Sequence, residues 1–269
     1  MKTMWYGVGI VASLTCAAGA QSPAPPAQDK TTVRQAAYDY AEGYYEAAAD
    51  RMERGVHPAI IKRGVLSRPG LGSVLAPMNA ETLVEATRMG GAKDVAPDKR
   101  NISFDLLDIR DNIASAKIFT VQFNDYLHLV KQDGRWRIAH VLWQPPAPAG
   151  AANSETDKAA VAQVLKDFFD ALSGGDTARV ERAVHPEAAL RGFRVSPPTG
   201  RFFLVEGNRD AMIAAASAKA VPPAQDLKVT VLDVYDTIAS ALVTTSTYSA
   251  YVHLAKQKDQ WRVVNLLRR

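Results

Sequence analysis

Tyrosine and histidine recur in pairs that could bind a ligand or transfer a proton. Tyr126 and His128 lie two residues apart in a strand-like segment, and Tyr251 and His253 repeat the pattern. Because successive strand residues point to opposite faces, each pair shares a face, whereas Asp125 lies on the opposite face. Such a pair can bind a carbonyl group or shuttle a proton, or it can hydrogen-bond across a seam between two sheets. We favour the seam; if the protein is an enzyme, its candidate catalytic residues are Tyr126, His128 and Asp125.

A second set of candidates combines histidine with arginine. His57 and His185 each precede a proline at the predicted end of a helix, and Arg63 and Arg191 follow them in the chain. A protonated histidine at a helix C-terminus interacts favourably with the helix dipole, which is the structural role that we favour. In a pocket, histidine could instead act as an acid or base, and arginine could bind an anion or form surface ion pairs. The candidate ligand contacts are His57, Arg63, Tyr251, His253, His185 and Arg191.

The residue patterns do not indicate metal, thiol or nucleic-acid chemistry. Cys16, the only cysteine, falls in a predicted leader, so the mature chain would have neither a thiolate nor a disulfide. No residues have metal-ligand spacing, and there is no phosphate loop or Gly-x-Ser-x-Gly elbow. The formal net charge is +4 with both signs interspersed, unlike the basic stripe of a nucleic-acid binder. We predict no metal, no cofactor and no nucleic-acid partner.

The N-terminus has the pattern of a secretory signal peptide. Lys2 precedes an uncharged, mostly apolar stretch from Met4 to Ala18, and Ala18-Gly19-Ala20 offers a cleavage site. A transmembrane helix needs about 20 apolar residues, and the sequence turns rich in proline and glutamine at Gln21. We therefore predict a signal peptide at 1–20, export to the periplasm or the medium, and no membrane span. A lipid anchor on Cys16 matches the sequence poorly.

The chain contains an internal repeat. Residues 51–64 and 179–192 are identical at 8 of 14 positions, including R-x-E-R-x-V-H-P. Residues 106–143 and 231–268 are identical at 16 of 38 positions, in the same order along the chain. This predicts two copies of one domain, at 31–143 and 154–269. A flexible spacer at 21–30 and a Pro/Ala linker at 144–153 flank the first copy.

Each copy is predicted to be an α+β domain. Apolar residues at helical spacing begin each copy, and a further helix is expected near 81–89 and 209–218. Strand-like segments at 102–109, 113–123, 126–131 and 136–143 follow in the first copy, the last two joined by an Asp-Gly turn. Helices followed by an antiparallel meander favour helices packed on one face of a sheet.

The segment 125–138, D-Y-L-H-L-V-K-Q-D-G-R-W-R-I, resembles the nuclear transport factor 2-like superfamily, and within it the putative lumazine-binding group. The second copy departs from this pattern, with Ala250 in place of Asp125. The resemblance implies two cone-shaped α+β rolls, each a curved antiparallel sheet wrapped on helices around an apolar pocket. Members are isomerases, dehydratases, cyclases or non-catalytic binders, and they are usually dimeric through their sheets. Two copies in one chain would make a monomer that acts as a pseudo-dimer.

Three functions are compatible with these patterns. We favour an exported protein that binds a small apolar or carbonyl-containing molecule in a pocket without transforming it. The first alternative is a cofactor-free isomerase, dehydratase or cyclase acting on a small carbonyl compound. The second alternative is a protein-binding module that uses the sheet face.

Overall fold

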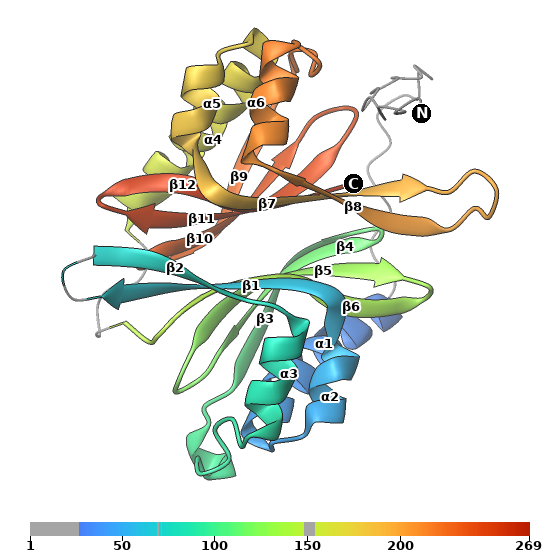
Figure 1. Cartoon of the computed structure of the whole chain (residues 1–269), viewed down its shortest axis with the longest axis vertical. Coiled ribbons are helices and arrows are strands. Elements are labelled where there is room, and N and C mark those ends of the chain that lie inside the picture. The colour runs from blue at the N-terminus through green and yellow to red at the C-terminus, as the bar shows by residue number, and fades with distance from the viewer. Residues whose placement is uncertain (1–26, 69, 71, 148–153) are drawn as a thin grey trace, which may run out of the picture.

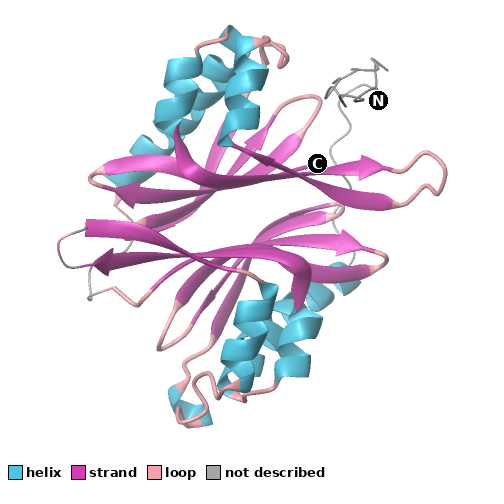
Figure 2. Cartoon of the chain, viewed as in Figure 1, coloured by secondary structure: helices cyan, strands magenta, loops and turns pink. Residues whose placement is uncertain are grey.

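The computed structural model describes residues 27–68, 70, 72–147 and 154–269. The predicted signal peptide, residues 21–26 of the predicted spacer and residues 148–153 of the predicted linker lie outside the described residues. The rest forms two α+β units packed sheet against sheet, with the helices of each unit on its outer side (Figure 1 and Figure 2). The layers therefore run helices, sheet, sheet, helices.

The two units have the same order of elements and the same six-stranded sheet. The first comprises α1 (Ala27–Tyr45), α2 (Ala49–Gly55), β1 (Val56–Arg68), β2 (Gly72–Met78), α3 (Ala80–Arg88), a 3-10 helix (Pro97–Lys99), β3 (Ser103–Arg110), β4 (Ile113–Phe119), β5 (Asn124–Gln132) and β6 (Arg135–Gln144). The second comprises α4 (Glu155–Gly174), α5 (Thr177–Ala183), β7 (Val184–Val195), β8 (Phe202–Asn208), α6 (Arg209–Ser217), β9 (Lys228–Tyr235), β10 (Ile238–Thr244), β11 (Ser249–Gln257) and β12 (Gln260–Arg268). The strand orders are β2-β1-β6-β5-β4-β3 and β8-β7-β12-β11-β10-β9.

Each sheet is mixed, which corrects the prediction of a wholly antiparallel sheet. β1 pairs antiparallel with β2 but parallel with β6, and β7 pairs in the same two ways with β8 and β12. The register of β1 on β6 shifts between Val56 and Ile61, and Pro58 lies in this irregular stretch, where no ladder N–H is needed. The His-Pro pair therefore begins a strand and does not cap a helix.

The first helix of each unit is fixed to the sheet through one aspartate. Asp29 accepts hydrogen bonds from Lys131 Nζ at 2.5 Å and from Trp136 Nε1 at 3.0 Å. Asp157 makes the same contacts with Lys256 and Trp261 in the second unit. Because Asp29 is paired and buried within α1, residues 27–30 are not the flexible spacer that we predicted.

The predicted linker also begins too early. Gln144 is the last residue of β6 and is buried. Its Nε2 donates to Asp236 Oδ2 at 2.9 Å, and its Oε1 accepts from Thr237 N at 3.1 Å. Because both amide groups of Gln144 bond to the second unit, this residue belongs to the folded structure.

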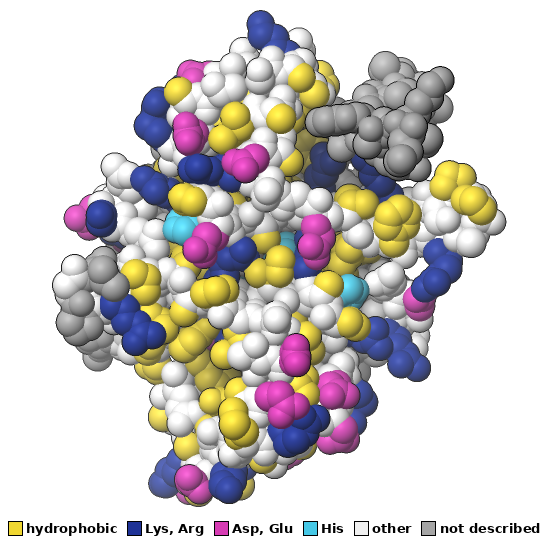
Figure 3. All heavy atoms as spheres, in the orientation of Figure 1, with side chains coloured by type: hydrophobic (Ala, Val, Ile, Leu, Met, Phe, Trp, Pro, Cys, Tyr) yellow, Lys and Arg dark blue, Asp and Glu magenta, His cyan; other side chains and the backbone are white. Residues whose placement is uncertain are grey.

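Each unit has an apolar core between its helices and its sheet, and smaller apolar clusters lie where the two sheets meet. The core face of α1 carries Val33, Ala36, Ala37 and Tyr40, as the helical spacing predicted. Among the described helices, none combines the length and the apolar character needed to cross a membrane. Charged side chains of both signs are mixed over the face drawn in Figure 3.

Candidate functional site

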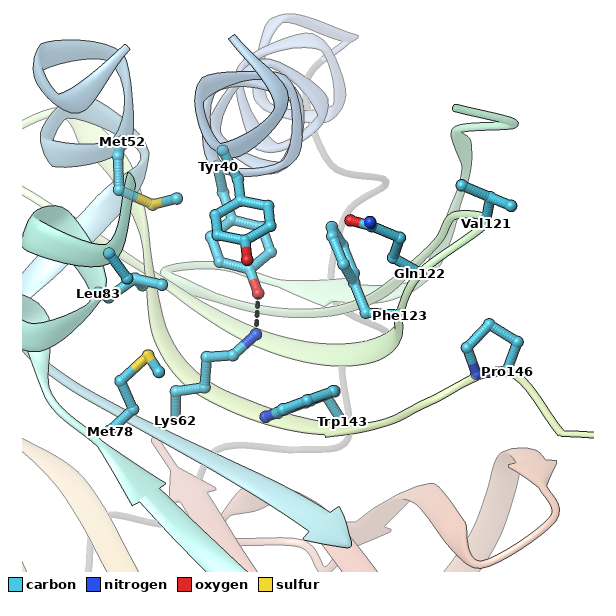
Figure 4. A pocket seen from close by; sticks show the side chains of 12 residues that line it. Tyr40, Met52, Lys62, Met78, Leu83, Val121, Gln122, Phe123, Trp143 and Pro146 are labelled. Atoms are coloured by element: carbon cyan, nitrogen blue, oxygen red, sulfur yellow. Dashed lines mark hydrogen bonds between the residues drawn. The ribbon is translucent and has the colours of Figure 1, made fainter. Parts of the chain in front are cut away.

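The first unit contains a cavity of about 510 Å³ between its helices and its sheet. A volume of this size is typical of sites for small organic ligands, roughly 300–1,000 Å³. The lining side chains come from α1, α2, β1, β2, α3, β6 and the segments that follow β4 and β6 (Figure 4). They are Tyr40, Tyr44, Met52, Lys62, Met78, Leu83, Ala86, Val121, Gln122, Phe123, Trp143 and Pro146.

Lys62 is the one charged residue among these lining side chains. Its side chain is only 8% exposed, and its Nζ lies 3.3 Å from Asp125 Oδ2. Nζ also donates a hydrogen bond to the hydroxyl of Tyr40, which in turn donates to Asp125 Oδ2 (Figure 4 shows the contact between Tyr40 and Lys62). The three polar groups thus form a closed triangle at the cavity wall, which we call the Tyr–Lys–Asp triangle.

Aromatic rings surround the lysine ammonium group. Lys62 Nζ lies 5.0 Å from the ring centroid of Tyr40, 5.5 Å from that of Phe123 and 4.9 Å from that of Trp143. Ring faces at these distances attract a cation. Lys62 is therefore held in place by rings as well as by hydrogen bonds, and it does not extend into solvent.

Burial changes the acid–base properties of the Tyr–Lys–Asp triangle. Desolvation lowers the pKa of Lys62, although the charge of Asp125 opposes this change. Desolvation raises the pKa of Asp125 against the opposing effects of Lys62 and Tyr40, and it also raises the pKa of Tyr40 well above its usual value. Oδ1 of Asp125 is buried and has no hydrogen-bond partner among the described residues. Burial therefore disfavours the charged forms of both Lys62 and Asp125, while each charge partly stabilises the other.

The second unit has apolar residues where the first has the triangle. The repeat aligns Tyr40 with Phe168, Lys62 with Leu190, and Asp125 with Ala250. All three replacements remove the polar group and leave an apolar side chain. The second unit therefore lacks the acid–base groups of the first at the corresponding place.

The second unit also carries one larger side chain. Phe169 stands where the first unit has Ala41, and its ring packs against those of Phe168 and Tyr248 with centroid distances of 4.9 and 6.2 Å. Beside Phe169 and Tyr248 lies a crevice of only about 10 Å³. The first unit is thus the better candidate for binding a ligand.

The structure divides the predicted catalytic residues between two places. Asp125 faces the cavity side and belongs to the Tyr–Lys–Asp triangle. Tyr126 and His128 lie on the other face of β5, in the seam between the sheets, so they are not part of the cavity. Tyr126 Oη donates to Asp233 Oδ2 at 3.0 Å, and the His128 ring stacks on that of His253 with centroids 3.4 Å apart. Strand parity predicted this division, because adjacent residues of a strand face opposite ways.

The predicted ligand contacts in the second unit also lie in the seam. Tyr251 Oη donates to Asp108 Oδ2 at 2.8 Å, which mirrors the contact of Tyr126 with Asp233. His253 packs on His128, and its Nδ1 lies 3.3 Å from Asn265 Nδ2. Tyr251 and His253 are therefore wrong as ligand contacts in the cavity.

The paired arginines connect the two units and do not reach the cavity. Arg63 Nη1 donates to Asn265 Oδ1 at 3.1 Å, and Arg63 also bonds to the carbonyl of Glu187. Arg191 Nη1 donates to the carbonyl of Ala139 at 2.8 Å. Both arginines point into the seam, because the face of β1 or β7 opposite the core is covered by the other unit. Neither arginine is among the residues that line the cavity, so the structure does not support them as ligand contacts there.

His57 and His185 are backbone-bonded residues at the start of β1 and β7. Nδ1 of each ring accepts a hydrogen bond, from Ala59 N in the first unit and Glu187 N in the second, both at 3.1 Å. Desolvation lowers the pKa of both histidines, which disfavours the protonated form that a helix cap would use. Neither histidine is among the residues that line the cavity. The structure therefore supports neither the predicted helix-capping role nor the predicted ligand contact in the cavity.

Sequence reasoning missed Tyr40 as a functional group and did not consider Lys62. Tyr40 was predicted only as part of the core face of the first helix. The signal that could have found both is the repeat itself. At three positions the first copy has a polar group and the second an apolar one, and these positions converge in space.

The fold and the cavity define the class of this protein: two nuclear transport factor 2-like domains in tandem. The family described as "Putative lumazine-binding" matches residues 28–144 and 156–267, and the chain belongs to this family. A search among curated proteins found no match.

Several solved structures of single domains are similar to part of this chain. A nuclear transport factor 2-like protein of unknown function from Silicibacter pomeroyi DSS-3 is 21% identical, covering 44% of this chain and 98% of its own, with a TM-score of 0.37. One from Methylobacillus flagellatus KT is 16% identical, covering 48% and 100% respectively, with a TM-score of 0.37. A ketosteroid isomerase-like protein from Erwinia carotovora atroseptica SCRI1043 is 11% identical, covering 45% and 99%, with a TM-score of 0.31.

Proposed function

We propose that this is an exported protein that binds one small, largely aromatic molecule in the cavity of its first domain without transforming it. This proposal rests on the position of Lys62, which is bonded to Tyr40 and Asp125 at the wall of an otherwise largely apolar cavity. An ammonium group has three N–H donors, and two are directed to Tyr40 and Asp125. The third can donate to a carbonyl, carboxylate or phenolate oxygen of the ligand, while its apolar body packs against the rings.

We expect 2-naphthoate to bind the wild-type protein and to quench the fluorescence of Trp143, which lines the cavity. Replacing Lys62 with leucine, the residue of the second copy, should weaken binding roughly 10–100-fold, because a hydrogen bond to a charged group contributes about 1.5–3 kcal/mol. Lys166→Leu is the matched control, since Lys166 is exposed on α4 in the second unit. Equal affinity of the two variants would contradict the proposal.

A cofactor-free enzyme acting on a small carbonyl compound is the second candidate. The Tyr–Lys–Asp triangle favours it, because Tyr40 lines the cavity and donates to Asp125, so a proton from a substrate carbon could pass through Tyr40 to the carboxylate. Proton NMR of 2-tetralone in D₂O would separate the candidates: an enzyme would speed exchange at the carbon beside the carbonyl, and a binder would not. The face of each sheet that a protein-binding module would use is covered by the other sheet, which weighs against that alternative.

Export and oligomeric state belong to the same proposal. The apolar stretch before Ala20 supports removal of residues 1–20, and the covered sheet faces support a monomer. Native mass spectrometry of protein purified from its own host should show a monomer that begins at Gln21 and carries one small organic ligand. A mass that includes residues 1–20 or a lipid on Cys16 would exclude the expected maturation. A stable dimer in solution would contradict the prediction that one chain, with its two packed domains, is a monomer that acts as a pseudo-dimer.

A further inference from the structure

Lys62 has the surroundings of a lysine that reacts as an amine. It is almost fully buried, and removal from water disfavours the charged ammonium form and so favours the nucleophilic neutral amine. Asp125 Oδ2 lies 3.3 Å from Nζ and can take the ammonium proton without any movement of the backbone. The hydroxyl of Tyr40 bonds to both groups and can carry a proton between Asp125 and a bound carbonyl oxygen.

The same groups are replaced together in the second domain. The second domain lacks the phenol, the amine and the carboxylate, because these positions are occupied by Phe168, Leu190 and Ala250. A lysine that served only as a positive charge for an anion would need no phenol beside it. The joint presence in one copy and joint absence in the other fit three groups that act as one unit.

We propose that Lys62 forms an imine with an aromatic aldehyde or ketone in the cavity, so that the ligand is held by a reversible covalent bond. This rests on the proposed function, because the cavity and its preferred ligand class are the same. It goes further in naming the reactive atom and the group that the ligand must carry.

The reaction balances without any oxidant, reductant or cofactor. The Lys62 ammonium gives a proton to Asp125, and its nitrogen lone pair forms a bond to the carbonyl carbon. The electron pair of the C=O double bond moves to oxygen, which takes a proton from the Tyr40 hydroxyl, and Tyr40 in turn takes the proton that the nitrogen releases. A second proton from Asp125 lets this oxygen leave as water, and the nitrogen lone pair closes the C=N bond. The products are one water molecule and a protonated imine beside the Asp125 carboxylate.

The test is reductive trapping on the full mature chain at pH 7. The protein is incubated with 2-naphthaldehyde and sodium cyanoborohydride, which reduces the imine to a stable amine. Intact mass and tryptic peptide mapping then locate the adduct. We expect one adduct per chain, on the peptide Gly55–Arg63 with cleavage blocked at Lys62, formed about ten-fold faster than at any exposed lysine. In Asp125→Asn, adduct formation should slow by about 100-fold, the usual contribution of a general acid or base.

Lys62→Arg keeps a cation but cannot form an imine, and it should give no adduct at this position. Binding of 2-naphthoate to the wild type without labelling of Lys62 by the aldehyde would overturn the imine and leave the proposed function standing. Labelling of Lys62 no faster than that of exposed lysines would also overturn it. If neither compound occupies the cavity, both proposals fail.

Discussion

Mild acid should unfold this protein, with most of the stability lost between pH 6 and pH 4.5. The cause is a cluster of three buried histidines in the seam. Burial lowers the pKa of His128 and of His140 well below the usual value, and it lowers that of His253 to about 3. Neighbouring positive charges, from the other histidines and, for His140, from Arg191 and Arg63, act in the same direction.

The sign of the effect follows from proton uptake. Below pH 6.5 the unfolded chain protonates these histidines, whereas the folded chain keeps them neutral, so acid favours the unfolded state. Their contribution is complete above pH 6.5 and is lost as the pH falls towards the folded pKa values. Each histidine lowers the free energy of unfolding by about 1.36 kcal/mol for each unit that the pH falls, so three histidines together lower it by roughly 4 kcal/mol per unit. A domain's whole stability is typically about 5–15 kcal/mol, so a fall of this size is decisive.

Urea unfolding at pH 7, 6 and 5 measures this slope directly. His140→Asn is the matched variant, since the second copy carries Asn265 at the equivalent position. It should reduce the slope, because it removes one of the five histidines whose pKa burial lowers. The lowered pKa values of Asp29 and Asp157 act below about pH 4 and so do not enter this range. A free energy of unfolding that stays constant from pH 7 to pH 5 would show that the histidines are accessible to protons in the folded state.

Asp125→Ala should lower the free energy of unfolding by about 3–5 kcal/mol, because it leaves the buried ammonium of Lys62 without its counter-charge. The triple variant Tyr40→Phe, Lys62→Leu, Asp125→Ala installs the residues of the second copy. It should recover this loss, since replacing a whole buried ion pair by apolar groups is often neutral or stabilising by about 1–4 kcal/mol.

The triple variant should nevertheless bind no 2-naphthoate. Urea unfolding at pH 7 and fluorescence titration of the wild type and both variants provide the comparison. We expect Asp125→Ala to be unstable and the triple variant to be stable but unable to bind 2-naphthoate. That result would show that the Tyr–Lys–Asp triangle is kept for binding at the expense of stability. A triple variant as unstable as Asp125→Ala would instead assign the three residues a purely structural role.

The sequence alone determined the two-domain plan and much of the local structure. The repeat predicted two copies of one fold. Helical spacing predicted the first and last helices of each copy, and strand spacing predicted the last four strands of the first copy. Strand parity placed Tyr126 and His128 on the face opposite Asp125, because the alternation of side chains along a strand depends only on adjacent residues. The β1–β2 hairpin was predicted only as a short extended segment, since the parallel pairing of β1 with β6 joins residues far apart in the chain.

Only the tertiary structure decided where the site lies. Tyr40, Lys62 and Asp125 come from α1, β1 and β5, and neither periodicity nor spacing relates positions on three separate elements. In the sequence Lys62 is one of many charged residues. It becomes a buried amine because α1 packs across the sheet at Tyr40 and because rings from two further segments close around Nζ. Whether a cavity stays open depends on the summed volumes of side chains from all these elements, and the first domain keeps one of about 510 Å³.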